Sequence, residues 1–145
     1  MRIHTLRGQM QEGLVRRLVV DDGRLNHGMR VTKFVVFTDD PSNISHDVHA
    51  VLGYQGNFVK LLDASDNNQI AWASSNVFGV GGIDYGWSLI DPNHVIIRDL
   101  YITGTVGTSG GALRFNYYIE MEAVDLSDDQ TILQLIKERN QGELR

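Results

Sequence analysis

Histidine and carboxylate side chains are the residues of this sequence that could ligate a metal ion. His46 and His49 lie three residues apart at the start of a predicted strand, and residues at i and i+3 of a strand face opposite sides. Asp63, Ser65 and Asn67 have the spacing that begins an EF-hand calcium loop, but the glycine and the flanking helices of that loop are missing. We expect no metal site and no cofactor; a weak calcium site between loops is the alternative to a simple turn at Asp63.

Acid–base and nucleophilic chemistry have no clearer signature. Glu120 and Glu122 share one strand face at a spacing that could suit a glycosidase pair, but a solvated strand face is the better interpretation. The serines lack a GxSxG elbow, and the glycine-rich segments 79–86 and 104–111 are followed by strands rather than by the helix of a phosphate-binding loop. Cysteine is absent, which excludes thiol nucleophiles and disulfides. We expect no catalytic residue.

The overall charge argues against two classes of partner. The chain has 145 residues with 13 Lys and Arg against 18 Asp and Glu, a formal net charge of -5. A free-standing nucleic-acid-binding protein normally carries excess basic residues that displace counterions, so we expect no direct contact with nucleic acid. The longest apolar runs are far shorter than the ~20 residues of a membrane span. The start also lacks the apolar segment of a signal peptide, so we expect no membrane contact and no secretion by that route.

The charge is unevenly distributed along the chain. Residues 1–30 hold six Arg against three acids, and residues 120–145 hold seven acids against three basic residues. Arginine is favoured at interfaces because its guanidinium binds carboxylates and stacks on aromatic rings. The charged ends either balance each other within one chain or join the basic start of one subunit to the acidic tail of a neighbour. On the second interpretation the candidate oligomer-interface residues are Arg2, Arg7, Arg16, Arg17, Asp128, Asp129 and Glu138.

The elements that would position these residues are mainly β-strands. Segments rich in β-branched and aromatic residues, bounded by turn clusters, predict strands over 14–21, 30–38, 47–54, 58–62, 69–75, 85–90, 94–103 and 113–123. The clearest is 113–123, where apolar and polar residues alternate over eleven positions. Ser127 and Gln130 form a capping box that begins a helix predicted over 128–140.

This rhythm of about eight strands without alternating helices predicts a mainly β fold, an antiparallel β-sandwich of jelly-roll type with a short C-terminal helix. We divide the chain into an N-terminal arm (1–13), a sandwich domain (14–126) and a C-terminal helix with its tail (127–145). The arm shows no periodicity of its own, so we expect its deletion to leave a folded body and to weaken assembly. The helix would close the open end of the sandwich or dock on a neighbouring subunit.

An arginine-bearing start, a β-rich body with Gly/Ser loops and a small terminal helix resemble the small structural proteins of virus particles. The stretches that carry this resemblance, one of style rather than of motif, are 16–23, 87–92 and 116–122. It implies a jelly-roll-like capsid, capsid-decorating or head–tail protein of a bacteriophage or other virus. Such a protein has no enzymatic role, assembles in the host cytoplasm and binds copies of itself and other virion proteins. The acidic net charge favours a shell or exterior position.

Two other classes of function remain open. The first alternative is a lectin-like sandwich in which an exposed aromatic ring stacks on a sugar. Its candidate platforms are Trp72, Trp87, Tyr85, Tyr101 and Tyr118. The third possibility is an enzyme on the same fold, which the missing metal and nucleophile motifs make the least favoured of the three.

Overall fold

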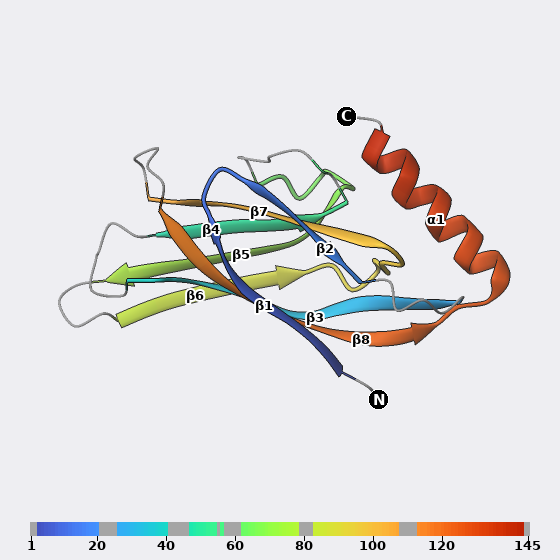
Figure 1. Cartoon of the computed structure of the whole chain (residues 1–145), viewed down its shortest axis with the longest axis horizontal. Coiled ribbons are helices and arrows are strands. Elements are labelled where there is room, and N and C mark those ends of the chain that lie inside the picture. Colours follow the sequence, from blue (N-terminus) through green and yellow to red (C-terminus); the bar gives the residue numbers. More distant parts are fainter. Residues whose placement is uncertain are drawn as a thin grey trace.

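The computed structural model describes residues 3–20, 26–40, 47–54, 56, 62–78, 83–107 and 113–143. Within these ranges the chain forms eight strands followed by one helix (Figure 1). The elements are β1 (Ile3–Gln11), β2 (Val15–Val19), β3 (His27–Thr38), β4 (Val48–Gly53), β5 (Gln69–Phe78), β6 (Ile83–Ile90), β7 (Asp99–Val106), β8 (Arg114–Asp125) and α1 (Asp128–Glu143). The strand expected over 58–62 lies almost entirely outside the described residues.

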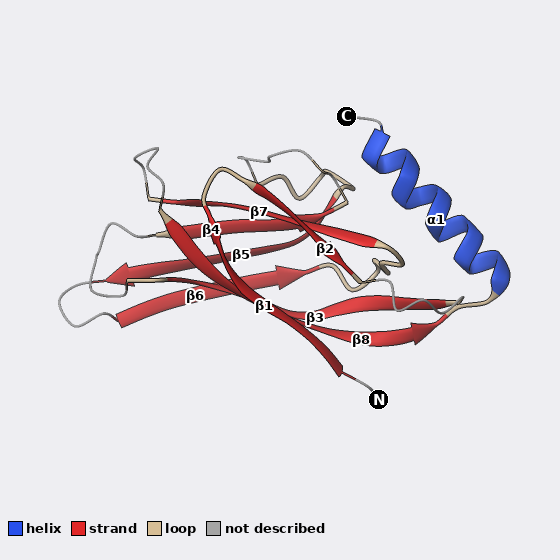
Figure 2. Cartoon of the chain, in the orientation of Figure 1, coloured by secondary structure: helices blue, strands red, loops and turns tan. Residues whose placement is uncertain are grey.

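The strands form two antiparallel sheets that pack face to face, with α1 at one end of the sandwich (Figure 2). The smaller sheet has the order β1-β8-β3, and the larger has the order β2-β7-β4-β5-β6. Every neighbouring pair is antiparallel. The prediction of a mainly β antiparallel sandwich with a C-terminal helix is therefore confirmed.

The strand order is that of a jelly roll with one seam left open. A jelly roll is a long antiparallel hairpin rolled up so that the first strand lies beside the eighth, the second beside the seventh, the third beside the sixth and the fourth beside the fifth. Here β1–β8, β2–β7 and β4–β5 are hydrogen-bonded ladders. Among the described residues, β3 and β6 lie close together without a ladder, and β6 instead extends the larger sheet through β5.

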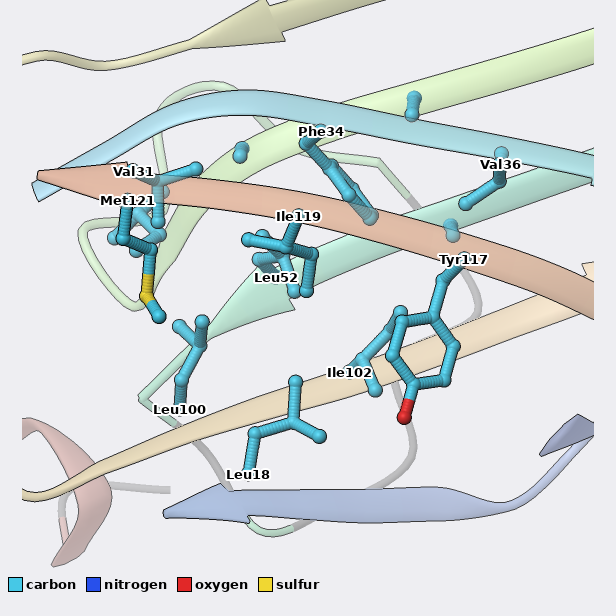
Figure 3. Close-up of a cluster of buried hydrophobic side chains, with 14 of the residues drawn as sticks. Leu18, Val31, Phe34, Val36, Leu52, Leu100, Ile102, Tyr117, Ile119 and Met121 are labelled. Carbon is cyan, nitrogen blue, oxygen red and sulfur yellow. The ribbon is translucent and has the colours of Figure 1, made fainter. Parts of the chain in front are cut away.

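The alternation along β8 builds the centre of the core. Phe115, Tyr117, Ile119 and Met121 are each at most 5% exposed, whereas the residues between them lie on the outer face. Figure 3 shows the side chains of β8 and β3 meeting those of the larger sheet. The labelled core residues are Leu18, Val31, Phe34, Val36, Leu52, Leu100, Ile102, Tyr117, Ile119 and Met121. The period-2 pattern thus predicted both the strand and its buried face.

A β-bulge changes the phase of β3. Val31 pairs with Met121 and Lys33 pairs with Glu120, so Thr32 is the extra residue on the bulged strand. Its hydroxyl donates to the carbonyl oxygen of Glu120 at 3.2 Å. Before the bulge the odd-numbered Val31 faces the core, and after it the even-numbered positions do. The bulge therefore turns the side chains at positions 33, 35 and 37 outward.

The N-terminus differs from the sequence expectation. Residues 1–13 were expected to form an arm outside the sheets, but Ile3–Gln11 is β1, which pairs with β8 over nine residue pairs. Met10 is 2% exposed and Leu6 packs against the core cluster. His4 and Gly8 occupy two of the inward positions, so the sequence lacks the alternation of apolar and polar residues that predicts a strand. The arm is, over this range, an edge strand of the smaller sheet.

A second difference concerns the strand predicted over 94–103. The β7 ladder begins only at Asp99 and continues through Val106, into the glycine-rich segment 104–111, for which no strand was predicted. Ile96 instead makes an isolated bridge to Met29, with reciprocal backbone hydrogen bonds of 2.7 and 2.8 Å. The β-branched residues before Asp99 thus form a buried connecting segment rather than a strand. Their apolar side chains are removed from water by burial, which does not require strand pairing.

The capping box at the start of α1 is confirmed. The backbone N–H of Gln130 donates to Ser127 Oγ at 3.2 Å, and the N–H of Ser127 donates to Gln130 Oε1 at 2.9 Å. Two donors that a helix start leaves without intrahelical partners are satisfied in this way. The helix is longer than predicted, sixteen residues ending at Glu143 rather than at position 140.

Ser127→Ala should lower the free energy of unfolding by about 0.5–2 kcal/mol, because the Gln130 N–H loses its acceptor. Urea denaturation followed by circular dichroism measures this change. Ser127→Asn, which keeps a side-chain acceptor, is the matched control and should stay within about 0.5 kcal/mol of the original chain. An equal loss in both variants would contradict the capping role.

Candidate functional site

An open groove of about 520 Å³ lies on the outer face of the smaller sheet. Each of the three strands of this sheet contributes side chains to the groove, at positions that lie opposite one another in the ladders. Arg7 on β1 and Val35 on β3 both lie opposite Tyr118 on β8, and Phe37 lies opposite Asn116. The groove exists because the β3 bulge places apolar side chains on the outer face. Its volume falls within the ~300–1,000 Å³ that small-molecule sites occupy.

The groove combines an aromatic floor with positive charge. The Lys33 ammonium lies 5.8 Å from the centre of the Tyr118 ring, and Arg7, which is exposed on β1 opposite Tyr118, lines the same groove. Neither cation has an ion pair within the described part of the chain. The Tyr118 hydroxyl donates to Glu120 Oε1 at 3.2 Å. Loss of solvation and this bond to Glu120 raise the pKa of Tyr118, whereas Arg7 opposes the shift.

Two of the candidate interface arginines have partners within the chain. Arg16 Nη1 donates to the Tyr117 hydroxyl at 3.3 Å, and its guanidinium lies 5.9 Å from the centre of that ring. Arg17 Nε lies 2.9 Å from Asp99 Oδ1. These contacts tie β2 to β8 and to β7, and neither partner lies in the acidic segment 120–145.

The other candidate interface residues divide into two groups. Arg7 lines the groove, and Asp129 is exposed on the first turn of α1. Arg2 lies outside the described residues, as do the side chains of Asp128 and Glu138. Of the four candidates whose side chains the structure describes, all are exposed, and Arg7 and Asp129 are the two for which no contact within the chain has been given above.

Large apolar side chains are exposed at two further places. On β6, Trp87 is 48% and Leu89 is 64% exposed. Trp87 also borders a smaller cavity of about 200 Å³ at the seam between β3 and β6. On α1, the apolar stripe was expected either to close the sandwich or to dock on a neighbouring subunit, and it leaves Ile132, Leu133 and Ile136 at 56%, 67% and 50% exposed. Contiguous apolar surface of this kind typically marks a binding surface.

The aromatic platforms considered for a sugar lie in different environments. The Trp72 indole donates to Gln69 Oε1 at 2.8 Å and is half-buried. Trp87 is exposed on β6, and Tyr118 forms part of the groove. Tyr101 is half-buried on β7. The side chain of Tyr85 lies outside the described residues.

Two histidine clusters resemble catalytic arrangements without completing one. Ser74 Oγ lies 2.9 Å from His49 Nδ1, which is a nucleophile–base distance. The other ring nitrogen of His49 has no partner in the described ranges, so no third group among these residues orients the base. The second cluster joins His94 to Asp91 at 3.0 Å and to the Tyr54 hydroxyl at 3.3 Å. His94 and Tyr54 are both buried.

The buried histidine cluster connects α1 to the sandwich. Gln134 Nε2 donates to the Tyr54 hydroxyl at 3.4 Å, and the Thr131 hydroxyl donates to Asn26 Oδ1 at 2.9 Å. Burial lowers the pKa of His94 and the Lys137 ammonium lowers it further, whereas the Asp91 carboxylate opposes both. These bonds hold the helix at the end of the sandwich, so we interpret the cluster as structural.

The free energy of unfolding should fall as the pH drops below the ordinary histidine pKa of 6.5. The folded chain holds His94 neutral to a lower pH than the unfolded chain does, so the unfolded state binds the extra proton. Urea denaturation at about pH 7.5 and about pH 5.5 measures the slope. His94→Gln should reduce the slope, and identical slopes for the original chain and His94→Gln would refute this role.

The remaining candidate ligands and acids have ordinary partners. The Asp63 carboxylate accepts from the backbone N–H and the hydroxyl of Ser65 at 3.0 and 2.6 Å, which is an Asx turn. Glu122 accepts from Arg30 at 3.4 Å. His46 lies outside the described residues. Among the described residues no three His, Cys, Asp or Glu side chains come together to hold a metal ion.

The fold and this surface define a jelly-roll β-sandwich with an open groove on its smaller sheet. The chain matches no protein-family model, no curated protein and no solved structure. Over the described ranges, no helix is long and apolar enough to span a membrane.

Proposed function

We propose that this chain is a non-enzymatic structural subunit of a virus particle, a capsid, capsid-decorating or head–tail protein that assembles with copies of itself and with other virion proteins. It would assemble in the host cytoplasm and reside in the virion. The observation that carries the proposal is a jelly roll with apolar side chains exposed at separate places. Leu89 on β6 is 64% exposed and Leu133 on α1 is 67% exposed. Jelly rolls are a recurrent architecture of capsid domains.

Sheet edges supply further surface for assembly. β1 and β3 are the edges of the smaller sheet, and β2 and β6 are those of the larger. An edge strand presents backbone donors and acceptors that another chain can pair with, and charged side chains discourage this. β2 carries Arg16 and Arg17, whereas β6 carries a single charged residue, Asp84. β6 is accordingly the edge best suited to contact another subunit.

Light scattering on a size-exclusion column, with mass photometry, tests the proposal. A subunit should give masses that are multiples of 16.3 kDa and that grow with concentration. Leu89→Lys should reduce assembly without lowering the melting temperature, because the side chain is already exposed. A chain that stays monomeric up to about 1 mM would overturn the proposal, since even a contact of about 4 kcal/mol would be detected there.

The groove favours one competing function, a lectin-like sandwich. Tyr118 provides an aromatic face beside Asn116 and Arg7, and aromatic stacking with nearby polar groups is how a protein can hold a sugar ring. Titration of the chain with a panel of neutral and acidic oligosaccharides, followed by NMR, tests this. The lectin function would replace the structural role if a monomeric chain bound an oligosaccharide saturably and if Tyr118→Ala abolished this binding while Tyr101→Ala did not.

A further inference from the structure

The exposed face of α1 is a continuous stripe. Asp129, Ile132, Leu133 and Ile136 follow the i, i+3, i+4 and i+7 spacing of one helix face, and all four are exposed. The other face is held by its own chain through Thr131 and Gln134, as described above. The stripe therefore points away from the sandwich that carries it.

The groove on the smaller sheet is complementary to this stripe. Val35, Phe37 and Tyr118 offer apolar and aromatic surface, and Phe37 is 42% exposed. Arg7 and Lys33 flank that surface without ion pairs among the described residues, while the stripe begins with an acid at Asp129. An amphipathic helix laid in an apolar groove is a recurrent mode of recognition.

A chain cannot place its own helix in its own groove. Tyr118 lies seven residues before the end of β8 at Asp125, a distance of roughly 23 Å at the rise of an extended strand. The helix begins three residues later at Asp128, and its bonds to Asn26 and Tyr54 fix it at the end of the sandwich. Figure 1 shows α1 beyond the end of β8. The occupant must come from another molecule.

We propose that the exposed face of α1 from one copy docks in the groove of a second copy. Ile132, Leu133 and Ile136 would cover Val35, Phe37 and Tyr118, and Asp129 would approach Arg7 or Lys33. This contact rests on the proposed self-assembly and names its two surfaces. Each copy carries both surfaces, so the contact extends from copy to copy unless the geometry closes it.

Charge-reversal and apolar variants test the contact by sedimentation velocity. Arg7→Glu and Leu133→Asp should each weaken self-association by about tenfold or more. Arg114→Glu is the matched control, since it reverses the charge of an exposed arginine on β8 outside the groove, and it should change the dissociation constant by less than about twofold. Far-ultraviolet circular dichroism and the melting temperature check that each variant is folded.

A mixing experiment distinguishes this contact from a general loss of assembly. The Arg7→Glu chain keeps its helix face and the Leu133→Asp chain keeps its groove, so an equimolar mixture should form a two-chain complex that neither variant forms alone. Because the chain has no cysteine, Phe37→Cys in one chain and Leu133→Cys in another should form an intermolecular disulfide on mild oxidation. Phe37→Cys with Val19→Cys, at an exposed β2 position, is the control pair.

The outcomes separate the two proposals. If the original chain assembles and the Arg7→Glu and Leu133→Asp variants assemble equally well, the helix–groove contact is wrong and assembly uses another surface. The same holds if the control cysteine pair cross-links as efficiently as the test pair. If the original chain is monomeric at every concentration, the structural-subunit proposal fails together with this contact. Saturable binding of an oligosaccharide that blocks cross-linking without preventing assembly would assign the groove to the sugar.

Discussion

Phe115→Ala should lower the free energy of unfolding by about 3–5 kcal/mol, the cost of removing a fully buried aromatic ring from a packed core. Phe115 is 0% exposed on β8. It also fills the space over Gly104 on the facing sheet, where an added Cβ would lie 2.5 Å from the ring atom Cζ. The ring thus packs directly on the backbone of β7, and a cavity there would separate the two sheets.

Guanidinium denaturation measures this loss, and the neighbouring residue gives the control. Arg114 lies on the outer face of the same strand, so Arg114→Ala should change the free energy of unfolding by less than about 0.5 kcal/mol. Similar losses for the two variants would show that the inward and outward positions of β8 have been exchanged.

Deletion of residues 1–11 should leave a chain that no longer unfolds cooperatively. This reverses the expectation drawn from the sequence, because β1 pairs with β8 along its whole length. Loss of the buried Met10 side chain alone should cost about 2–5 kcal/mol, and the exposed edge of β8 would add to that. The sum is comparable with the whole stability of a domain, about 5–15 kcal/mol.

Point variants within β1 separate packing from pairing. Met10→Ala should lower the melting temperature clearly, whereas Gln9→Ala, which removes one exposed hydrogen bond to Asn116 of 3.2 Å, should cost about 1 kcal/mol or less. A truncated chain with a cooperative transition at the original temperature would show that β1 is a detachable arm, as its sequence suggested.

The elements predicted correctly are those in which local pattern and tertiary burial agree. In β8, apolar side chains occupy every second position and all of them face the core. In β4, which lies within the strand predicted over 47–54, the alternating apolar residues Val48, Ala50 and Leu52 are at most 1% exposed. The Ser127–Gln130 capping box depends on contacts within four residues. Such short-range signals can be found in a sequence without knowledge of distant partners.

The elements that were missed depend on distant partners. β1 places His4 and Gly8 at inward positions, and it is a strand because β8 offers an edge about 110 residues later in the chain. The groove is formed by side chains of three strands that are brought together by their pairing register, and no local sequence pattern contains that register. Of the seven candidate interface residues, Arg7 lies in this groove, but the charge imbalance that identified it also selected Arg17, which pairs with Asp99.

The bulge at Thr32 makes the length of β3 as important as its composition. Removing Thr32 itself would join Val31 to Lys33 in regular alternation and leave Phe34 and Val36 facing the core. Removing a residue after the bulge, such as Phe34, would instead bring Val35 and Phe37 to the core side and turn Val36 to solvent, so that one deletion would disturb the core and the groove together. Substitutions at the outer positions carry no such penalty. Homologous chains should therefore align across positions 34–38 without a gap, and within β3 the position of Thr32 is where a one-residue difference in length leaves both faces intact.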